Sequence, residues 1–371
     1  MEIIKGKFSS GIVFSENAEP YALIQVKNIC DNEVSSGCRV RVMPDVHPGM
    51  VAPIGLTMTV GKKILPYLVG IDIGCGITLA RIVKHRGVEF KKLDTVIRDG
   101  VPCGFDTRKS PHRFSADFDF SRLKCNVYKE KAALSLCSLG GGNHFIEIDK
   151  SDSGEFYISV HSGSRHLGKE VADFYLAQGQ RVLKERGETV PFELTYLEGS
   201  LMSDYLQDLS VVQEFAALNR LAIIDEIARG MKWKCDEPVS CVHNYVDFRD
   251  SEPILRKGAV SARTGESVII PVNMRDGIIL GTGKGNADWN YSAPHGSGRI
   301  MKREDIKRQF TVSAFKAEMK GIYSSCISKG TLDEAPFAYR RLEEIQKAVE
   351  PTVSVSSVLT PVYNFKAQTE V

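Results

Sequence analysis

Apolar residues recur along the chain at two different spacings, and these spacings predict which segments are strands and which are helices. Short apolar runs bounded by turn residues predict strands in the first ninety residues, namely the opening stretch, 11–15, 21–29, 38–46 and 54–60. Three later runs of the same kind predict further strands at 155–161, 266–272 and 276–281. Two of them, 155–161 and 266–272, end beside polar residues, as strands do when they lead into a loop.

Helical periodicity is strongest over 204–231. Apolar side chains return there at spacings of three and four residues or their multiples, at Leu206, Leu209, Phe215, Leu218, Ile224 and Ile227. Ser203 or Asp204 could cap the start of this helix. Weaker patterns predict helices at 168–186 and 336–349.

Strands and helices alternate without a regular βαβ rhythm, which predicts an α+β fold with mixed β-sheets in the core and helices packed outside. The chain has no repeat, low-complexity tract or long linker, so we expect one compact domain over residues 1–371. It also lacks an apolar run of about 18 residues, and no membrane span is expected.

The stretch "LVGIDIGCGITLARI", residues 68–82, is apolar enough for a buried strand but contains a carboxylate and a thiol. In a continuous strand Asp72 and Cys75 would point to opposite faces, because side chains alternate with a period of two. Glycines at 70, 74 and 76 allow the backbone to turn, and a turn can bring both side chains to one site. A bound cation would also offset the cost of burying the carboxylate.

Composition, net charge and cysteine spacing exclude several classes of protein. The chain is 43% hydrophobic and 25% charged, and its formal net charge of +2 gives no whole-protein attraction for nucleic acid. Nine cysteines show no CxxC spacing, so neither a zinc ribbon nor a disulfide framework is indicated, and free thiols predict a reducing cytoplasm. A local excess of four positive charges lies between Arg299 and Lys320, which as a lone feature is best interpreted as a solvated helix face.

Five of the eight histidines follow a common pattern, and four of these lie next to or within two residues of a glycine: His47, His144, His161, His243 and His295. A single histidine is more often a hydrogen-bonded core residue than a functional one, but this recurrence favours a shared site. Imidazole, thiolate and carboxylate are metal ligands, and Asp72, Cys75, His144, His161 and His243 could hold one or two ions. Ligand type alone favours zinc, since thiolate suits it better than manganese.

His295 lies in a different setting, "HGSGR", which suits phosphate better than a metal. A neutral imidazole beside phosphate is a competent nucleophile, and Arg299 could grip phosphate oxygens. Just upstream, "GTGKGN" could cradle phosphate through backbone amides and Lys284, although a flexible hairpin turn explains it equally well. It is not a Walker A loop, because Gly285 follows the lysine.

Nine motifs in fixed order resemble the RtcB family of RNA ligases over roughly residues 40–366: "MPDVHPG", "LVGIDIGCG", "LGGGNHFIE", "HSGSR", "NR" at 219–220, "HN" at 243–244, "RKGAVSA", "GKGN" and "HGSGR". The resemblance implies an RtcB-like fold and an enzyme that joins RNA ending in a 3′-phosphate or 2′,3′-cyclic phosphate to RNA bearing a 5′-hydroxyl. It implies GTP and two manganese ions as cofactors, a histidine–GMP intermediate, and roles in RNA repair or tRNA splicing, with an accessory activating factor as a possible partner.

The resemblance also assigns residues. Asp72, Cys75 and His144 would bind one manganese ion, while Cys75, His161 and His243 would bind the other. His295 would be guanylylated. The expected nucleotide and phosphate contacts are Asn143, Glu147 (to guanine), Asn273, Lys284, Gly296 and Lys366, and the expected RNA contacts are Arg165 and Arg299.

The chain departs from the family pattern in two places. Asn273 and Ile278 stand where the family commonly has serines near the nucleotide, and His166 stands where glycine is usual. The chain is also shorter than many members, consistent with a divergent paralogue. Two other functions stay open at this stage: a metal-dependent phosphoesterase acting on RNA ends, and an RNA-end-binding protein that does not ligate.

Overall fold

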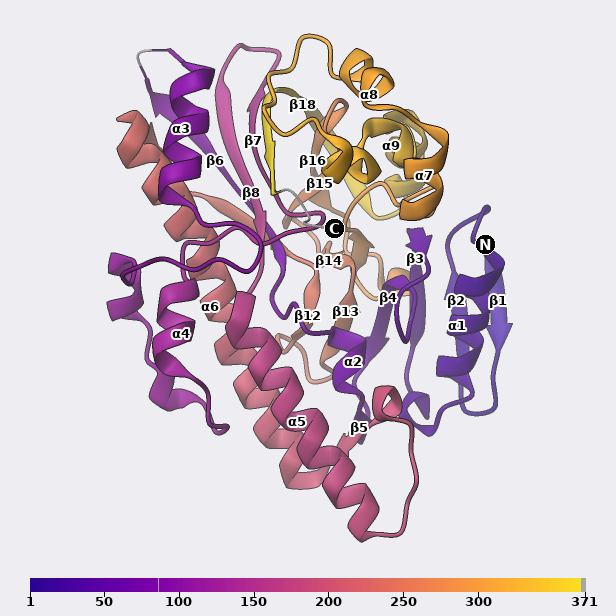
Figure 1. Cartoon of the computed structure of the whole chain (residues 1–371). Coiled ribbons are helices and arrows are strands. Elements are labelled where there is room, and N and C mark those ends of the chain that lie inside the picture. Colours follow the sequence, from indigo (N-terminus) through magenta and orange to yellow (C-terminus); the bar gives the residue numbers. More distant parts are fainter. Residues whose placement is uncertain (86, 368–371) are drawn as a thin grey trace.

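Two large β-sheets form the centre of the molecule in the computed structural model, which describes residues 1–85 and 87–367 (Figure 1). The first sheet has the strand order β1 (Glu2–Lys5), β2 (Ser10–Val13), β3 (Val40–His47), β4 (Ile54–Thr59), β13 (Ile254–Lys257) and β12 (Asn244–Asp247). The second has the order β10 (Lys234–Cys235), β6 (Gly76–Lys84), β8 (Phe156–Ser162), β7 (Phe145–Lys150), β18 (Val353–Lys366), β16 (Gly277–Gly283) and β15 (Ser267–Asn273), with β11 (Val239–Val242) also paired to β6. The six-stranded sheet is mixed, because β2 and β3 pair in parallel, and the eight-stranded sheet is antiparallel. Two short pairs complete the strands: β14 (Ala259–Ser261) with β17 (Ser292–Pro294), and β5 (Lys63–Ile64) with β9 (Leu197–Glu198).

Helices lie outside these sheets. They are α1 (Pro20–Cys30), α2 (Pro66–Val69), α3 (Phe90–Gly100), α4 (Lys129–Ser135), α5 (Arg165–Glu185), α6 (Gly199–Met231), α7 (Arg303–Gln309), α8 (Val312–Glu318) and α9 (Leu342–Val349). Short 3₁₀ turns occupy Glu33–Ser35, Arg113–Asp117, Phe120–Arg122, Phe192–Leu194, Ala287–Trp289, Lys329–Glu334 and Pro336–Ala338. The long helix α6 packs on β6 and β8 and carries α3 and α5 beside it, so it supports the strands that lead to the site (Figure 1). No helix in the described part of the chain is long and apolar enough to cross a membrane.

The expected α+β architecture is confirmed, as are the strands at 155–161, 266–272 and 276–281 and the helix at 168–186. The segment 21–29 was expected to be a strand, and this prediction is wrong. It forms α1, whose buried side chains Ala22, Val26, Ile29 and Cys30 follow a helical spacing, and Pro20 at its first turn suits a helix start.

The expected boundaries of two other helices are also wrong. α6 begins at Gly199, so Ser203 and Asp204 lie inside it, and the Ser203 hydroxyl donates to the Gly199 carbonyl within the helix. The helix expected over 336–349 is broken: a 3₁₀ turn at Pro336–Ala338 is followed by α9 from Leu342.

The run at 68–82 is not one strand either. Leu68 and Val69 end α2, Ile71 is 46% exposed in the following turn, and β6 starts only at Gly76.

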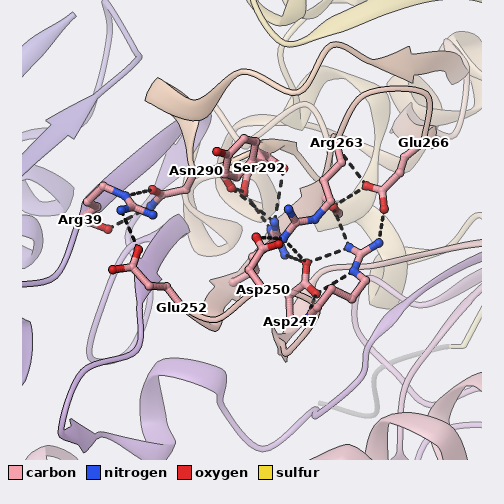
Figure 2. A network of polar contacts seen from close by, with 12 residues as sticks. Arg39, Asp247, Asp250, Glu252, Arg263, Glu266, Asn290 and Ser292 are labelled. Carbon is pink, nitrogen blue, oxygen red and sulfur yellow. Dashed lines mark hydrogen bonds and ion pairs between the residues drawn. The ribbon is translucent and has the colours of Figure 1, made fainter.

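Figure 2 shows a polar network that ties β12 and β13 to β17. The Arg256 guanidinium is fully buried, donating to the Asp247 carboxylate at 2.8 Å and to the Ser292 hydroxyl at 2.8 Å. The Asp247 carboxylate also accepts a hydrogen bond from the Arg249 guanidinium at 2.7 Å. Because Ser292 lies three residues before His295, this network fixes the strand that leads to that histidine.

Replacing Asp247 with asparagine is expected to lower the free energy of unfolding by about 3 kcal/mol at neutral pH, since it leaves the buried Arg256 without its ionic partner. Burial alone would raise the pKa of Asp247, but hydrogen bonds from Arg249 and the charge of Arg256 outweigh it and hold the pKa well below its usual range. The stabilisation is therefore complete above a pH of about 4, the pKa in the unfolded chain, and is lost as the pH falls further. Urea unfolding between pH 3 and pH 7 measures how the free energy of unfolding depends on pH in the two proteins. A variant with the same acid sensitivity as the parent chain would contradict it, and the exposed Asp152→Asn serves as control.

Candidate active site

Strand register brings four of the five candidate metal ligands to one end of the eight-stranded sheet. Cys75 comes just before Gly76, and Gly76 pairs with Val242, which is followed directly by His243. The backbone N–H of His243 donates to the Cys75 carbonyl at 2.9 Å. On the other side of β6, Ile77 pairs with His161, and Phe145, which follows His144, pairs with the same His161 on β8.

A tight turn adds the carboxylate. Gly74 has a φ of 71°, and a Cβ there would lie only 2.8 Å from the Ala216 Cβ on α6. A Cβ on Gly163 would lie 2.0 Å from the Asp72 carboxylate. These two glycines therefore allow the turn at 70–75 to fold between α6 and β8 and bring Asp72 beside Cys75.

Two buried polar residues of α6 hold this turn in place. The Arg220 guanidinium donates to the carbonyls of Gly74 at 2.8 Å and Ser162 at 3.0 Å. The Asn219 amide donates to the Gly163 carbonyl at 3.1 Å. The "NR" pair thus supports the ligands from behind and does not touch a substrate.

The donor atoms of all five residues converge. Cys75 Sγ lies 3.3 Å from both His144 Nε2 and His161 Nε2. His144 Nε2 lies 3.0 Å from Asp72 Oδ2, and His161 Nε2 lies 3.2 Å from His243 Nε2. The thiol and the three imidazoles are at most 5% exposed, whereas the Asp72 side chain is 34% exposed, so solvent reaches the cluster only at the carboxylate.

These donors fit divalent metal ions. His161 Nδ1 lies 3.2 Å from the Asn143 carbonyl, so Nδ1 carries the proton and the Nε2 lone pair faces the cluster. Burial lowers the pKa of His161 and His243 well below the usual histidine value, which keeps both rings in the neutral form that binds metals. Burial and the nearby Asp72 raise the pKa of Cys75, so its thiolate forms when a cation compensates the charge.

A second group of potential ligands, His112, Cys137 and Glu226, lies among the described residues. It does not suit a metal, because His112 Nδ1 accepts the backbone N–H of Phe114 at 3.2 Å and the proton is therefore on Nε2, the atom that faces the group. Arg108 already lies 3.3 Å from the Glu226 carboxylate and supplies a positive charge there.

His295 stands beside the metal-ligand cluster. Its ring centroid is 4.8 Å from that of His243, so His144, His161, His243 and His295 form a row of four imidazoles. His295 Nδ1 donates to the fully buried Asp45 carboxylate at 2.7 Å. The Nε2 lone pair is thus free to attack an electrophile. Asp45 lies in the motif "MPDVHPG", but no local pattern predicts its contact with a residue 250 positions away.

A cavity opens next to His295. Together with the open solvent at its mouth, its empty space is about 750 Å³. Of the residues expected to bind nucleotide or RNA, its lining includes Asn143, Glu147, Asn273, Gly296, Lys366 and Arg299. His47 lines the cavity too, and burial lowers its pKa to about 4, so its ring is neutral at physiological pH.

Two expected contacts are not brought to this cavity. Lys284 lies just after the end of β16, where its side chain donates to the Glu350 carbonyl, and it does not line the cavity. Arg165 lies at the start of α5 with a φ of 54°, and its guanidinium donates to the Gly104 carbonyl and the Ser138 hydroxyl. It lies close enough to Asp72 to favour the ionised carboxylate.

Six of the seven basic residues in the segment 299–320 are exposed, as expected of a solvated face, but Arg299 and Arg303 also reach a buried acidic partner. Glu334 is buried, and its carboxylate lies 3.2 Å from Arg299, 2.6 Å from Arg303 and 3.0 Å from Lys366. The Tyr339 hydroxyl donates to it at 2.6 Å. Glu334 lies outside the basic segment in the sequence and becomes its ionic partner only in the fold. No sequence pattern therefore predicts this buried carboxylate in the cavity wall.

The fold places five potential metal ligands beside a histidine whose Nε2 is available, which is the arrangement of a candidate metalloenzyme. The family model for tRNA-splicing ligase RtcB matches residues 25–126 and 120–367. The chain belongs to the RtcB family, which confirms the resemblance noted in the sequence.

Among curated relatives, RNA-splicing ligase RtcB of Escherichia coli K12 is 31% identical over 369 residues, covering 87% of this chain and 88% of the relative. RNA-splicing ligase RtcB2 of another E. coli strain is 27% identical, covering 83% of this chain and 82% of the relative. The tRNA-splicing ligase RtcB of Aeropyrum pernix is 26% identical and covers 82% of each chain.

Proposed function

We propose that this protein is an RNA ligase that joins RNA ending in a 3′-phosphate or 2′,3′-cyclic phosphate to RNA bearing a 5′-hydroxyl, at the expense of GTP. The observation that carries the proposal is the orientation of His295: Asp45 holds Nδ1, Nε2 is free, and the ring lies between the metal-ligand cluster and the cavity. Family membership supports the reaction class. Repair of cleaved RNA and tRNA splicing are the processes that such a reaction would serve.

In the first step His295 Nε2 attacks the α-phosphorus of GTP. A bond forms between nitrogen and phosphorus, and the bond from phosphorus to the bridging oxygen of pyrophosphate breaks. Asp45 keeps the proton on Nδ1 and stabilises the positive charge that develops on the ring. Glu147, Asn273, Asn143 and Lys366 line the cavity that would receive the base and phosphates.

In the second step an oxygen of the RNA 3′-phosphate attacks the phosphorus of His295–GMP, which releases the histidine and forms an RNA–pp–G end. In the third step the 5′-hydroxyl of the other RNA attacks the RNA 3′-phosphorus and expels GMP. A 2′,3′-cyclic phosphate must first be opened by hydrolysis to the 3′-phosphate, because the terminal oxygen of that monoester is the nucleophile of the second step. Arg299 in the cavity wall and Arg165 beside Asp72 are the candidate RNA contacts.

Two manganese ions are the proposed metals. Asp72, Cys75 and His144 would hold one and Cys75, His161 and His243 the other, with the Cys75 sulfur shared between them. Such ions would supply Lewis-acid polarisation of phosphate oxygens and neutralise negative charge.

The test is covalent labelling. Protein incubated with manganese and α-labelled GTP is expected to gain label that is stable to alkali and lost in acid, and then to join a 3′-phosphate RNA to a 5′-hydroxyl RNA. A phosphoesterase would remove the RNA phosphate without using GTP, and a protein that only binds ends would leave both RNAs unchanged. Either result would reject the proposal.

Asp45→Asn is expected to slow adduct formation by about a hundredfold or more, with little change in the KM for GTP. The amide cannot stabilise the developing charge on His295 and can hold the ring in the wrong tautomer. Single-turnover labelling measures the rate. A larger change in KM than in kcat would contradict the role of Asp45 as a positioning residue. Asp152→Asn, in an exposed loop, is the control.

A further inference from the structure

Glu147 has a second carboxylate directly behind it. Glu147 and Asp149 are two residues apart on β7, so their side chains lie on the same face of the strand. Their exposed fractions are 2% and 0%. Glu147 lines the cavity, whereas Asp149 does not, so Asp149 can act on a ligand only through Glu147.

The neighbours of this pair supply hydrogen bonds but no ion pair among the described residues. From β18, the Asn364 amide donates to Glu147 Oε2 at 2.5 Å. From β8, the Ser159 hydroxyl donates to Asp149 Oδ2 at 3.0 Å, while Asp149 Oδ1 has no hydrogen-bond partner in the described structure. Two buried carboxylates without a paired cation are costly to ionise together.

The nearest positive charge is already engaged. Lys366 Nζ, also on β18, lies 3.0 Å from the Glu334 carboxylate and 3.4 Å from the Asn143 carbonyl. Its charge favours ionisation of Glu147 to a lesser extent than Asp149 opposes it. His161 and His295 also line the cavity, and burial keeps His161 neutral.

The two carboxyl groups therefore share a proton near neutral pH. Burial, and then the adjacent Asp149, raise the pKa of Glu147 well above its usual range, and burial raises the pKa of Asp149 to about 6. With increasing pH the pair loses this proton, and Glu147 becomes a carboxylate. The charge of Asp149 thus controls the pH at which Glu147 changes state.

The two states of Glu147 match different purine bases. A carboxylate offers two acceptors, which complement the N1–H and N2–H donors of guanine. A carboxylic acid offers one donor and one acceptor, which complement N1 and the N6 amino group of adenine. We propose that Asp149 is a positioning residue for the proton on Glu147 and thereby sets whether the cavity accepts GTP or ATP. The proposal rests on the proposed function, in which this cavity takes the nucleotide.

Asp149→Asn tests it. The amide has the shape of the aspartate but removes the negative charge beside Glu147, so Glu147 should ionise at lower pH. The measurement is kcat and KM for covalent labelling of the full chain with α-labelled GTP and α-labelled ATP, from pH 6 to pH 8.5. For the parent chain the preference for GTP over ATP should increase with pH. For Asp149→Asn it should be high throughout, and at pH 6 about tenfold above that of the parent chain.

Glu147→Gln provides the opposite change. Glutamine offers one donor and one acceptor at every pH, so labelling by ATP should persist and the pH dependence of the base preference should disappear. The metal-ligand cluster is the same in all these proteins, so any effect of pH on it changes GTP and ATP labelling by the same factor. The ratio of GTP to ATP labelling therefore reports the base contact alone. Asp152→Asn, on the loop after β7, should behave as the parent chain does.

Identical preferences and pH profiles in the parent chain and Asp149→Asn would overturn the proposal. So would a pH-dependent preference in Glu147→Gln, which stays informative even if Asp149→Asn does not fold. By contrast, a parent chain that forms no adduct with either nucleotide at any pH would reject the proposed function itself.

Discussion

His295→Ala is expected to form no covalent adduct with GMP and to join no RNA, a loss of about 10⁴-fold or more relative to the parent chain. The substitution removes the nitrogen that attacks the α-phosphorus, and no other imidazole can replace it. His161 and His243 have their Nε2 atoms 3.2 Å apart within the metal-ligand cluster, and His47 is held by the Asp45 carbonyl at 3.0 Å. Labelling with α-labelled GTP in the presence of manganese measures the adduct, and gel analysis of joined RNA measures ligation.

A matched control separates this loss from a general effect of losing a histidine. His85→Ala removes a ring that packs edge-on against Phe156 at the far end of β6, and it should leave labelling unchanged. The His295 variant should also join RNA supplied with a ready-made RNA–pp–G end, because only the first two steps need the histidine. An adduct that survives His295→Ala would show that the nucleophile is a different residue.

Cys75→Ala is expected to remove both bound manganese ions and to abolish RNA joining. Its sulfur lies 3.3 Å from two imidazoles that would belong to different ions, so no other donor in the cluster can replace it. The measurement is the metal content of protein dialysed against manganese, which does not depend on activity. The expected change is from two ions per chain to none, and zinc and cobalt should be lost in the same way.

Cys38→Ala is the control, since the Cys38 thiol lies 3.6 and 3.7 Å from the Val34 and Ser36 carbonyls and belongs to none of the contacts of the metal-ligand cluster. This variant should keep two ions. Retention of both ions by Cys75→Ala would refute the shared ligand, and retention of one would assign Cys75 to a single ion.

The candidate ligands could be chosen from the sequence because their local settings are unusual. A carboxylate and a thiol among glycines, and histidines next to strand ends, are informative within a few residues of the chain. What brings them together is strand register, such as Gly76 opposite Val242, and this becomes visible only in the folded sheet. The sequence therefore identifies the candidate ligands but does not predict their geometry.

The contacts that the sequence missed are those between distant segments. Asp45 and His295 are 250 residues apart, and Glu334 meets Arg299, Arg303 and Lys366 only across the cavity wall. The β-branched and aromatic residues of the segment 21–29 favour a strand, but the segment is a helix because Ala22, Val26 and Ile29 pack on one side of it. Tertiary packing outweighed local propensity there.

The position of β18 has a consequence for how the molecule is made. This strand, Val353–Lys366, lies inside the eight-stranded sheet, hydrogen-bonded to β7 on one side and β16 on the other. During synthesis the edges of β7 and β16 therefore stay unpaired until residues 353–366 have left the ribosome, and exposed strand edges promote aggregation. The cavity, which needs Asn364 and Lys366 from this strand, is completed only then. A nascent chain that ends before β18 therefore lacks part of the cavity wall.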